Sequence, residues 1–153
     1  MMIKHTLISI LSLLTLLMAN SCSETGKAKT STITRKFFLN HEIPRNIDFE
    51  IYLNQKVLTK SRETDHMPGP YELNQKLVMG AVQKIRIKIM PAAGGAKVLN
   101  PKSIEFINRN LGIYLLENKD YDHIKTIKLL QYPVITKDTP EYDYEWTFNI
   151  KQP

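Results

Sequence analysis

Residues 82–91 read VQKIRIKIMP, and within them two kinds of side chain alternate. Isoleucine occupies positions 85, 87 and 89, whereas lysine or arginine occupies positions 84, 86 and 88. Successive side chains of a β-strand point to opposite faces of its sheet, so a period of two puts the isoleucines on one face and the cations on the other. The run predicts a strand that buries its isoleucines and ends near Pro91, which cannot donate a backbone hydrogen bond.

The same period of two recurs elsewhere in the chain. Residues 47–53, IDFEIYL, place four apolar side chains on one face, and residues 142–150, YDYEWTFNI, place a row of aromatic and aliphatic side chains on one face. Weaker strand patterns lie at residues 33–39, 111–115 and 124–132. We expect strands in all of these stretches.

The segments between the expected strands contain turn-forming residues, at 54–55, 67–70, 93–95 and 138–140. One stretch stays open between two structures. Asn100 and Pro101 can begin a short helix through Ile107, with Gly112 after its end, whereas residues 104–106 fit a strand equally well.

Short strands that do not alternate with helices favour an all-β fold. We expect a single antiparallel β-sandwich, of the Ig-like or jelly-roll kind, over residues 33–153. Asp48 and Glu50 lie on the outer face of one expected strand, and the cations at 84, 86 and 88 lie on that of another. These two strands are predicted to pair side by side, because cross-strand ion pairs contribute about 0.2–1 kcal/mol each.

The middle of the chain has a recognisable order of strand and turn residues. It runs through Phe49–Asn54, a polar loop, Pro70–Asn74, Gly80 and Ile85–Ile89. This order is similar to that of accessory β-sandwich modules of extracellular proteins, which include galactose-binding-like jelly rolls and Ig-like domains. The resemblance implies a β-sandwich, and it departs at Gln55, where those modules usually have glycine after the turn asparagine.

The N-terminal residues carry a targeting signal. Residues 6–18, TLISILSLLTLLM, are apolar except for threonine and serine, and Lys4 precedes them. Such a stretch is typical of a secretory signal peptide and is shorter than the roughly 20 residues of a transmembrane helix. The next residues, Ala19-Asn20-Ser21-Cys22, have small side chains three and one positions before the cysteine. They resemble the lipobox of bacterial lipoproteins.

The lipobox implies that residues 1–21 are removed and that Cys22 carries a diacylglycerol thioether, with palmitate among its acyl chains. Two or more acyl chains hold a protein firmly on a membrane. Residues 22–32 would form a lipidated flexible tether, because SETGKAKTST is small, polar and without apolar periodicity. Ser23 stands where an aspartate often retains such lipoproteins in the inner membrane, so the resemblance implies an outer-membrane anchor in the cell envelope, with the leaflet left open.

Cys22 is also the only cysteine of the chain. A disulfide within the chain, a CxxC redox pair and a cysteine-rich zinc site are therefore excluded. The alternatives to lipidation are a plain secretory signal followed by a free thiol and an uncleaved short anchor.

Glu63, Asp65 and His66 lie in a polar loop that continues to Tyr71. Carboxylate and imidazole ligands can hold a divalent metal ion, but no second histidine lies at metal-ligand spacing. We therefore expect no metal site. Long polar loops on rigid scaffolds commonly bind partners, so these four residues are the candidate binding loop.

Asp48 and Glu50 share a strand face at a separation of about 7 Å, which lies within the range of paired glycosidase carboxylates. Ion pairing with the cations at 84, 86 and 88 explains them better than catalysis does. No serine lies in a G-x-S-x-G motif, and no G-x-G-x-x-G or P-loop sequence occurs. We therefore expect no catalytic site and no cofactor, and a hydrolase using these carboxylates is the last alternative.

Tyr142, Tyr144 and Trp146 form an aromatic stripe at strand spacing. If the stripe faces water, it is a candidate stacking platform for sugar rings. Its continuation into Phe148 and Ile150 favours packing into the core.

The formal net charge is +6, but the basic residues are scattered along the chain, so we predict no nucleic-acid partner. The envelope location that the lipobox implies and the lack of catalytic motifs together indicate a binding protein that is anchored by lipid in the cell envelope. Its partner would be a protein, captured in envelope protection or assembly, and the alternative is a glycan at the cell surface.

Overall fold

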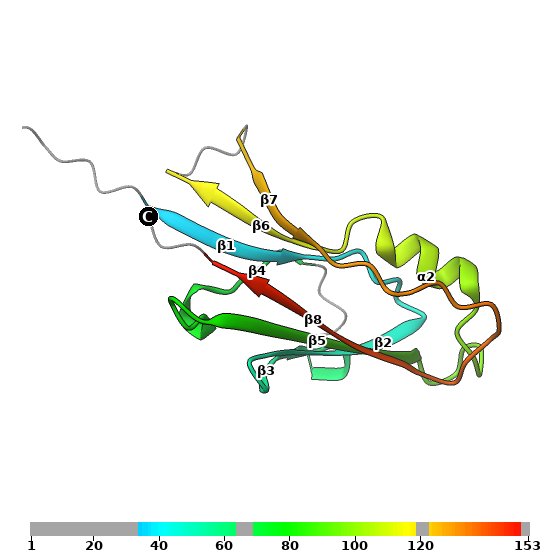
Figure 1. Ribbon diagram of the computed structural model, residues 1–153. Helices are drawn as coiled ribbons and strands as arrows, with labels where there is room; N and C mark the ends of the chain where they lie inside the picture. Colours follow the sequence, from blue (N-terminus) through cyan, green and yellow to red (C-terminus); the bar gives the residue numbers. More distant parts are fainter. Residues whose placement is uncertain (1–33, 64–68, 119–122, 151–153) are drawn as a thin grey trace, which may run out of the picture. The chain divides into compact units, whose positions relative to one another are not determined.

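The three strongest sequence patterns form strands. The computed structural model describes residues 34–63, 69–118 and 123–150 (Figure 1). Within them β2 spans Ile47–Leu53, β5 spans Val82–Pro91 and β8 spans Tyr142–Asn149. The prediction of a strand is confirmed in all three stretches.

The weaker patterns also form strands, with shifted ends. These strands are β1 (Arg35–Asn40), β6 (Gly112–Glu117) and β7 (Lys125–Leu129). The sequence patterns did not predict β3 (Lys56–Lys60) or β4 (Tyr71–Glu72). Both are short strands at the edge of a sheet, held by pairing with β2 and β1.

The strands form two antiparallel sheets of four. Sheet A has the order β4-β1-β6-β7, and sheet B has the order β3-β2-β5-β8. The predicted pairing of β2 with β5 is confirmed, with Glu50 opposite Lys88. The fold is thus mostly β, and its two sheets form the single β-sandwich that the alternating patterns predicted.

The core lies between the sheets and draws on both. Leu39 of β1 and Ile113 of β6 meet Phe49 of β2 and Ile87 of β5 in one buried cluster. Tyr132, from the segment after β7, is also buried and donates a hydrogen bond to the Ile87 carbonyl at 2.9 Å. Burial of such side chains is the main force that holds two sheets together.

The stretch that the sequence left open is a helix, α2 (Pro101–Asn108). Asn100 lies at its N-cap, where Oδ1 accepts a hydrogen bond from the Ser103 backbone N–H at 2.9 Å. Ile104 and Ile107 turn into the core. Gly112 does not end the helix, as the sequence had allowed, but begins β6. Within the described residues, no helix is long and apolar enough to cross a bilayer.

A two-residue turn joins β2 to β3 without glycine. Asn54 and Gln55 have φ values of 50° and 67°, the left-handed conformations that a type I′ hairpin turn requires. Asn54 is stabilised there because its side chain donates to Gln83 Oε1 at 2.8 Å and accepts from the Lys84 N–H at 3.0 Å. The similar sequence at residues 73–76 forms a short 3₁₀ turn instead, so the two segments are not structural repeats.

Candidate functional site

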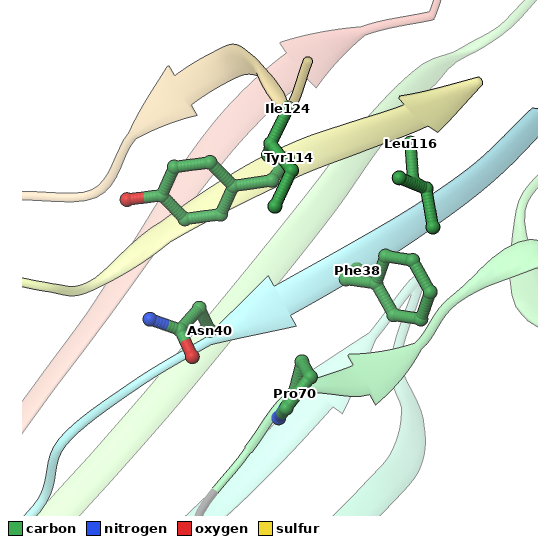
Figure 2. Close-up of a pocket in the computed structure, with 6 residues that line it drawn as sticks. All are labelled: Phe38, Asn40, Pro70, Tyr114, Leu116 and Ile124. Atoms are coloured by element: carbon green, nitrogen blue, oxygen red, sulfur yellow. The ribbon is translucent and has the colours of Figure 1, made fainter. Parts of the chain in front are cut away.

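A hollow on the outer face of sheet A is the candidate site (Figure 2). It has a volume of about 480 Å³. Side chains from two strands, β1 and β6, and from the segments before β4 and β7 line it: Phe38, Asn40, Pro70, Tyr114, Leu116 and Ile124. We call it the sheet A groove. Its size lies within the range of small-molecule pockets, and its lining is mostly apolar, as is usual for binding sites.

Two glycines allow the chain to approach closely around the groove. The Tyr114 ring lies over Gly112, where an added Cβ would come within 3.0 Å of the ring and 3.1 Å of the Lys128 carbonyl oxygen. Gly69 precedes Pro70, and a Cβ there would lie 3.1 Å from the Leu39 carbonyl oxygen. Side chains at either position would push a groove residue away from the sheet.

The groove has one polar end. In Figure 2 the Asn40 amide and the Tyr114 hydroxyl lie on one side, while Phe38 and Leu116 lie on the other. Asn40 Nδ2 donates a hydrogen bond to the Asn110 carbonyl oxygen at 3.3 Å, which holds the amide in place. The arrangement suits an apolar group that carries a hydrogen-bonding group at one end.

The sequence patterns did not single out this groove, although they contained a signal for it. Residues 37–39 (FFL) and 113–116 (IYLL) are continuous apolar runs within strands. In such a run one set of side chains enters the core and the other set must face outward. Here the outward set includes Phe38, Tyr114 and Leu116.

The candidate binding loop lies only partly within the described residues. Asp65 and His66 lie outside them, and Glu63 ends a short 3₁₀ turn at Ser61–Glu63. Tyr71 lies in β4, where its ring stacks on His41 with 5.4 Å between ring centroids. The loop re-enters the described structure at residue 69, beside Pro70 of the sheet A groove.

His41 is a buried titratable group between the sheets, with 2% of its surface exposed. Its ring meets Phe49 edge-on at 4.8 Å, and Nδ1 accepts a hydrogen bond from the Ile43 N–H at 3.4 Å. Nε2 has no hydrogen-bond partner among the residues that the structure describes. Burial disfavours the charged ring and lowers the pKa of His41 from 6.5 to about 4. His41 is therefore neutral at pH 7.

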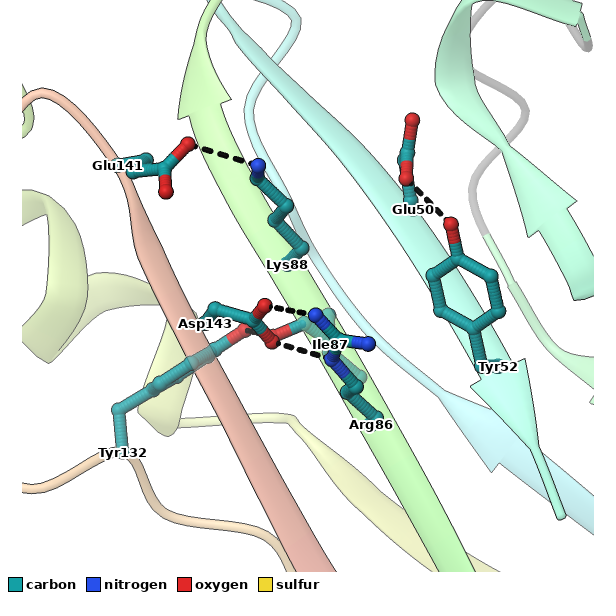
Figure 3. Close-up of polar contacts among 8 residues, drawn as sticks. All are labelled: Glu50, Tyr52, Arg86, Ile87, Lys88, Tyr132, Glu141 and Asp143. Atoms are coloured by element: carbon teal, nitrogen blue, oxygen red, sulfur yellow. Dashed lines mark hydrogen bonds and ion pairs between the residues drawn. The ribbon is translucent and has the colours of Figure 1, made fainter. Parts of the chain in front are cut away.

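The outer face of sheet B carries charges that pair between β5 and β8 (Figure 3). Arg86 makes two hydrogen bonds to the Asp143 carboxylate, and Lys88 Nζ lies 2.7 Å from Glu141 Oε2. The guanidinium lowers the pKa of Asp143, and the bond to Glu141 raises the pKa of Lys88. These cations pair with carboxylates on or beside β8, and the charge of Glu50, which lies opposite Lys88 on β2, also raises the pKa of Lys88.

The two carboxylates of β2 make other contacts. The 3₁₀ turn after β3 covers Asp48, whose Oδ1 accepts from Ser61 Oγ at 3.0 Å and whose Oδ2 accepts from Arg62 Nε at 2.7 Å. Glu50 accepts a hydrogen bond from the Tyr52 hydroxyl at 2.5 Å, which raises the pKa of Tyr52. Both carboxylates hold neighbouring parts of the fold, and a hydrolase that uses them stays an untested prediction.

The aromatic stripe of β8 turns toward the interior. Trp146 is 7% exposed, and its Nε1 donates to the Gln131 carbonyl oxygen at 3.1 Å. Tyr132 packs against both Trp146 and Tyr142, with ring centroids 4.9 Å and 5.0 Å away. Tyr144, at 38% exposure, presents the largest open aromatic surface of the stripe. The geometry corresponds to the core-packing alternative, and glycan binding there stays an untested prediction.

Among the residues that the structure describes, no group of three or more histidine, cysteine, aspartate or glutamate side chains is placed to hold a metal ion. Comparisons of the chain with protein-family models, with curated proteins and with solved structures found no match. The case for a function therefore depends on the surface itself.

Proposed function

We propose that the protein is a lipid-anchored cell-envelope protein that binds a partner protein in the sheet A groove. The observation that carries the proposal is the groove itself, a hollow of about 480 Å³ on an outer sheet face. Soluble proteins seldom expose concave apolar surface without a binding role. The anchor is supported by Ala19-Asn20-Ser21-Cys22, which lies outside the described residues.

The chemistry of the lining favours a protein segment over a glycan. Phe38, Leu116 and Ile124 offer no hydrogen bonds, so the hydroxyl groups of a sugar would lose their water without replacement. An apolar side chain of a partner would fill this part of the groove. A backbone or side-chain polar group beside it would reach Asn40 and the Tyr114 hydroxyl.

The anchor is tested by replacing the acylated residue. Cys22→Ala should abolish incorporation of labelled palmitate and release the protein from membranes that are washed in carbonate. Serine at position 23 makes a matched control, because Ser23→Ala leaves the thiol in place and should keep the label. Wild-type protein that carries no acyl group and dissolves without detergent would contradict the anchor.

The groove is tested with two matched exposed aliphatic residues. Ile124 lines the groove at 53% exposure, whereas Val134 is 88% exposed and is not among the groove residues. Ile124→Ser combined with Phe38→Ser should lower recovery of a cross-linked envelope partner at least about tenfold, because two apolar contacts are lost. Val134→Ser should recover the partner as wild type does. Equal recovery by the groove variant and the control would contradict the groove assignment.

A further inference from the structure

Four exposed apolar residues gather at one end of the sandwich. Val57, Val78, Met79 and Val82 are between 42% and 59% exposed. Val57 lies in β3 and Val82 begins β5, while Val78 and Met79 lie in the segment before it. We call these four residues the end patch.

The end patch rests on a fixed framework. Gln83 is fully buried beneath it, and its side chain binds the N–H and the carbonyl of Val78 and the carbonyl of Ala81. Asn54 of the β2–β3 turn binds both Gln83 and the Lys76 carbonyl. The apolar side chains are therefore held outward by bonds that satisfy the backbone beneath them.

The end patch lies at the end of the sandwich where β1 begins (Figure 1). A chain of hydrogen bonds connects the two places. Asn74 Nδ2 donates to the Arg35 carbonyl at 2.7 Å, and two residues later Lys76 Nζ donates to the Val57 carbonyl at 2.6 Å. Residues 22–33 precede β1 in the sequence, and any twelve residues reach at most about 43 Å. The end at which β1 begins is therefore the end of the sandwich nearest along the chain to the proposed anchor at Cys22.

The charges at this end suit an anionic surface. Glu72 is paired with Lys36, and Glu117 is paired with Arg35 and with Lys125. Lys56 and Lys76 have no ion pair with a described carboxylate. Apolar side chains with lysines beside them match the boundary between lipid headgroups and acyl chains.

We propose that the end patch inserts into the anionic lipid surface to which the chain is anchored, so that the domain lies on the bilayer in one orientation. The inference rests on the proposed function, because it needs the acyl anchor at Cys22. It has a structural consequence for the sheet A groove. With this end on the lipid, the strands stand on the surface and the outer face of sheet A stays open to solution.

The chain has a single cysteine, Cys22, which the proposed acyl group would block, so an introduced cysteine can be labelled by itself. Full chains with Met79→Cys or with Ala93→Cys are labelled with an environment-sensitive dye and placed in vesicles of phosphatidylethanolamine and phosphatidylglycerol that contain nitroxide lipids. Residue 93 is the control, because it is exposed and follows the far end of β5, roughly 30 Å away along the strand. The dye at position 79 should shift to the blue and be quenched severalfold more than the dye at position 93.

The remaining outcomes distinguish the lipid contact of the end patch from the acyl anchor at Cys22. Val78→Ser with Val82→Ser should remove the quenching at position 79, whereas Val134→Ser should not. Equal, solvent-like emission at positions 79 and 93 in chains that resist a carbonate wash would overturn the contact and leave the anchor standing. A blue shift without quenching would assign the patch to a protein contact and overturn the lipid proposal. If the wash releases the chain, the acyl anchor is contradicted. Quenching of the dye at position 79 when fresh vesicles are added then decides whether the end patch contacts lipid.

Discussion

The two sheets bury their inner faces in one core, yet their outer faces differ in chemistry. On sheet B the outward side chains are charged, and Arg86 and Lys88 are already paired with Asp143 and Glu141. On sheet A the outward side chains include Phe38, and they line a groove. A charge that is already paired within the fold contributes little to the binding of a partner. Filling an apolar hollow removes apolar surface from water, which makes the free energy of binding more favourable.

The difference follows from the sequence of the central strands. In β5 the apolar residues alternate with cations, so the face opposite the core must be charged. In β1 and β6 apolar residues follow one another at positions 37–39 and 113–116, so part of the outer face is apolar as well. The difference supports the proposal that a partner binds to sheet A, and it indicates that the charges of sheet B specify which strands lie side by side.

The largest expected effect separates inner from outer positions. Ile87→Ala in sheet B should lower the free energy of unfolding by about 2–5 kcal/mol, because Ile87 is fully buried. Phe38→Ala, on the groove face of sheet A, should lower the free energy of unfolding by only about 1 kcal/mol, since the Phe38 side chain is half-buried. Denaturant unfolding followed by the emission of Trp146 measures both. Equal losses would mean that Phe38 belongs to the core rather than to a binding surface.

A second effect comes from the histidine between the sheets. Because the pKa of His41 is about 4 in the fold and 6.5 when unfolded, the unfolded chain binds the proton more tightly between these values. Stability is therefore full above pH 6.5 and falls as the pH drops toward 4, by about 2.5 kcal/mol at pH 4.5. His41→Phe, which keeps an aromatic ring, should remove this loss.

The measurement is denaturant unfolding at pH 7 and pH 4.5. His123→Gln is the control, because it replaces an exposed histidine and should leave the acid sensitivity unchanged. If His41→Phe loses as much stability on acidification as wild type, another group governs the pH dependence.

These two predictions show how far the sequence determines the fold. The period of two located β2, β5 and β8 because each strand buries one face and exposes the other. It could not locate β4, since the two residues Tyr71 and Glu72 are extended only through pairing with β1. Alternation also reveals which face of β5 is charged, but not how its cations divide between the carboxylates of β2 and those of β8, the two strands beside it.

The candidate site was harder to predict than the strands. A groove depends on which outward residues of β1 and β6 become neighbours, and register is a tertiary property. Phe38 lies opposite Tyr114 only because β1 pairs with β6 at that register. The candidate loop, by contrast, was chosen on composition, and of its members Tyr71 packs on His41.

The smallest expected effect tests the charged face. Asp143→Asn removes the ion pair with Arg86, but both side chains are partly exposed, so the unfolding midpoint should fall less than for either change above. The loss should shrink in about 1 M salt, where the screening length is about 3 Å. The double variant Arg86→Gln with Asp143→Asn should lose less stability than the sum of the losses of the two single variants, because the two side chains are coupled.

The pH dependence separates this pair from His41. Arg86 lowers the pKa of Asp143 below its ordinary 3.8, so the pair stabilises the fold above that value and loses its effect only as the pH falls further. Asp143→Asn should therefore leave the loss of stability between pH 6.5 and 4.5 unchanged, while His41→Phe removes it. If Asp143→Asn instead abolished that loss, or its effect persisted undiminished in salt, the charges of sheet B would contribute to stability as the core does. The contrast between the two outer faces would then fail, because charges that stabilise the fold as strongly as core residues do not form a merely solvated surface.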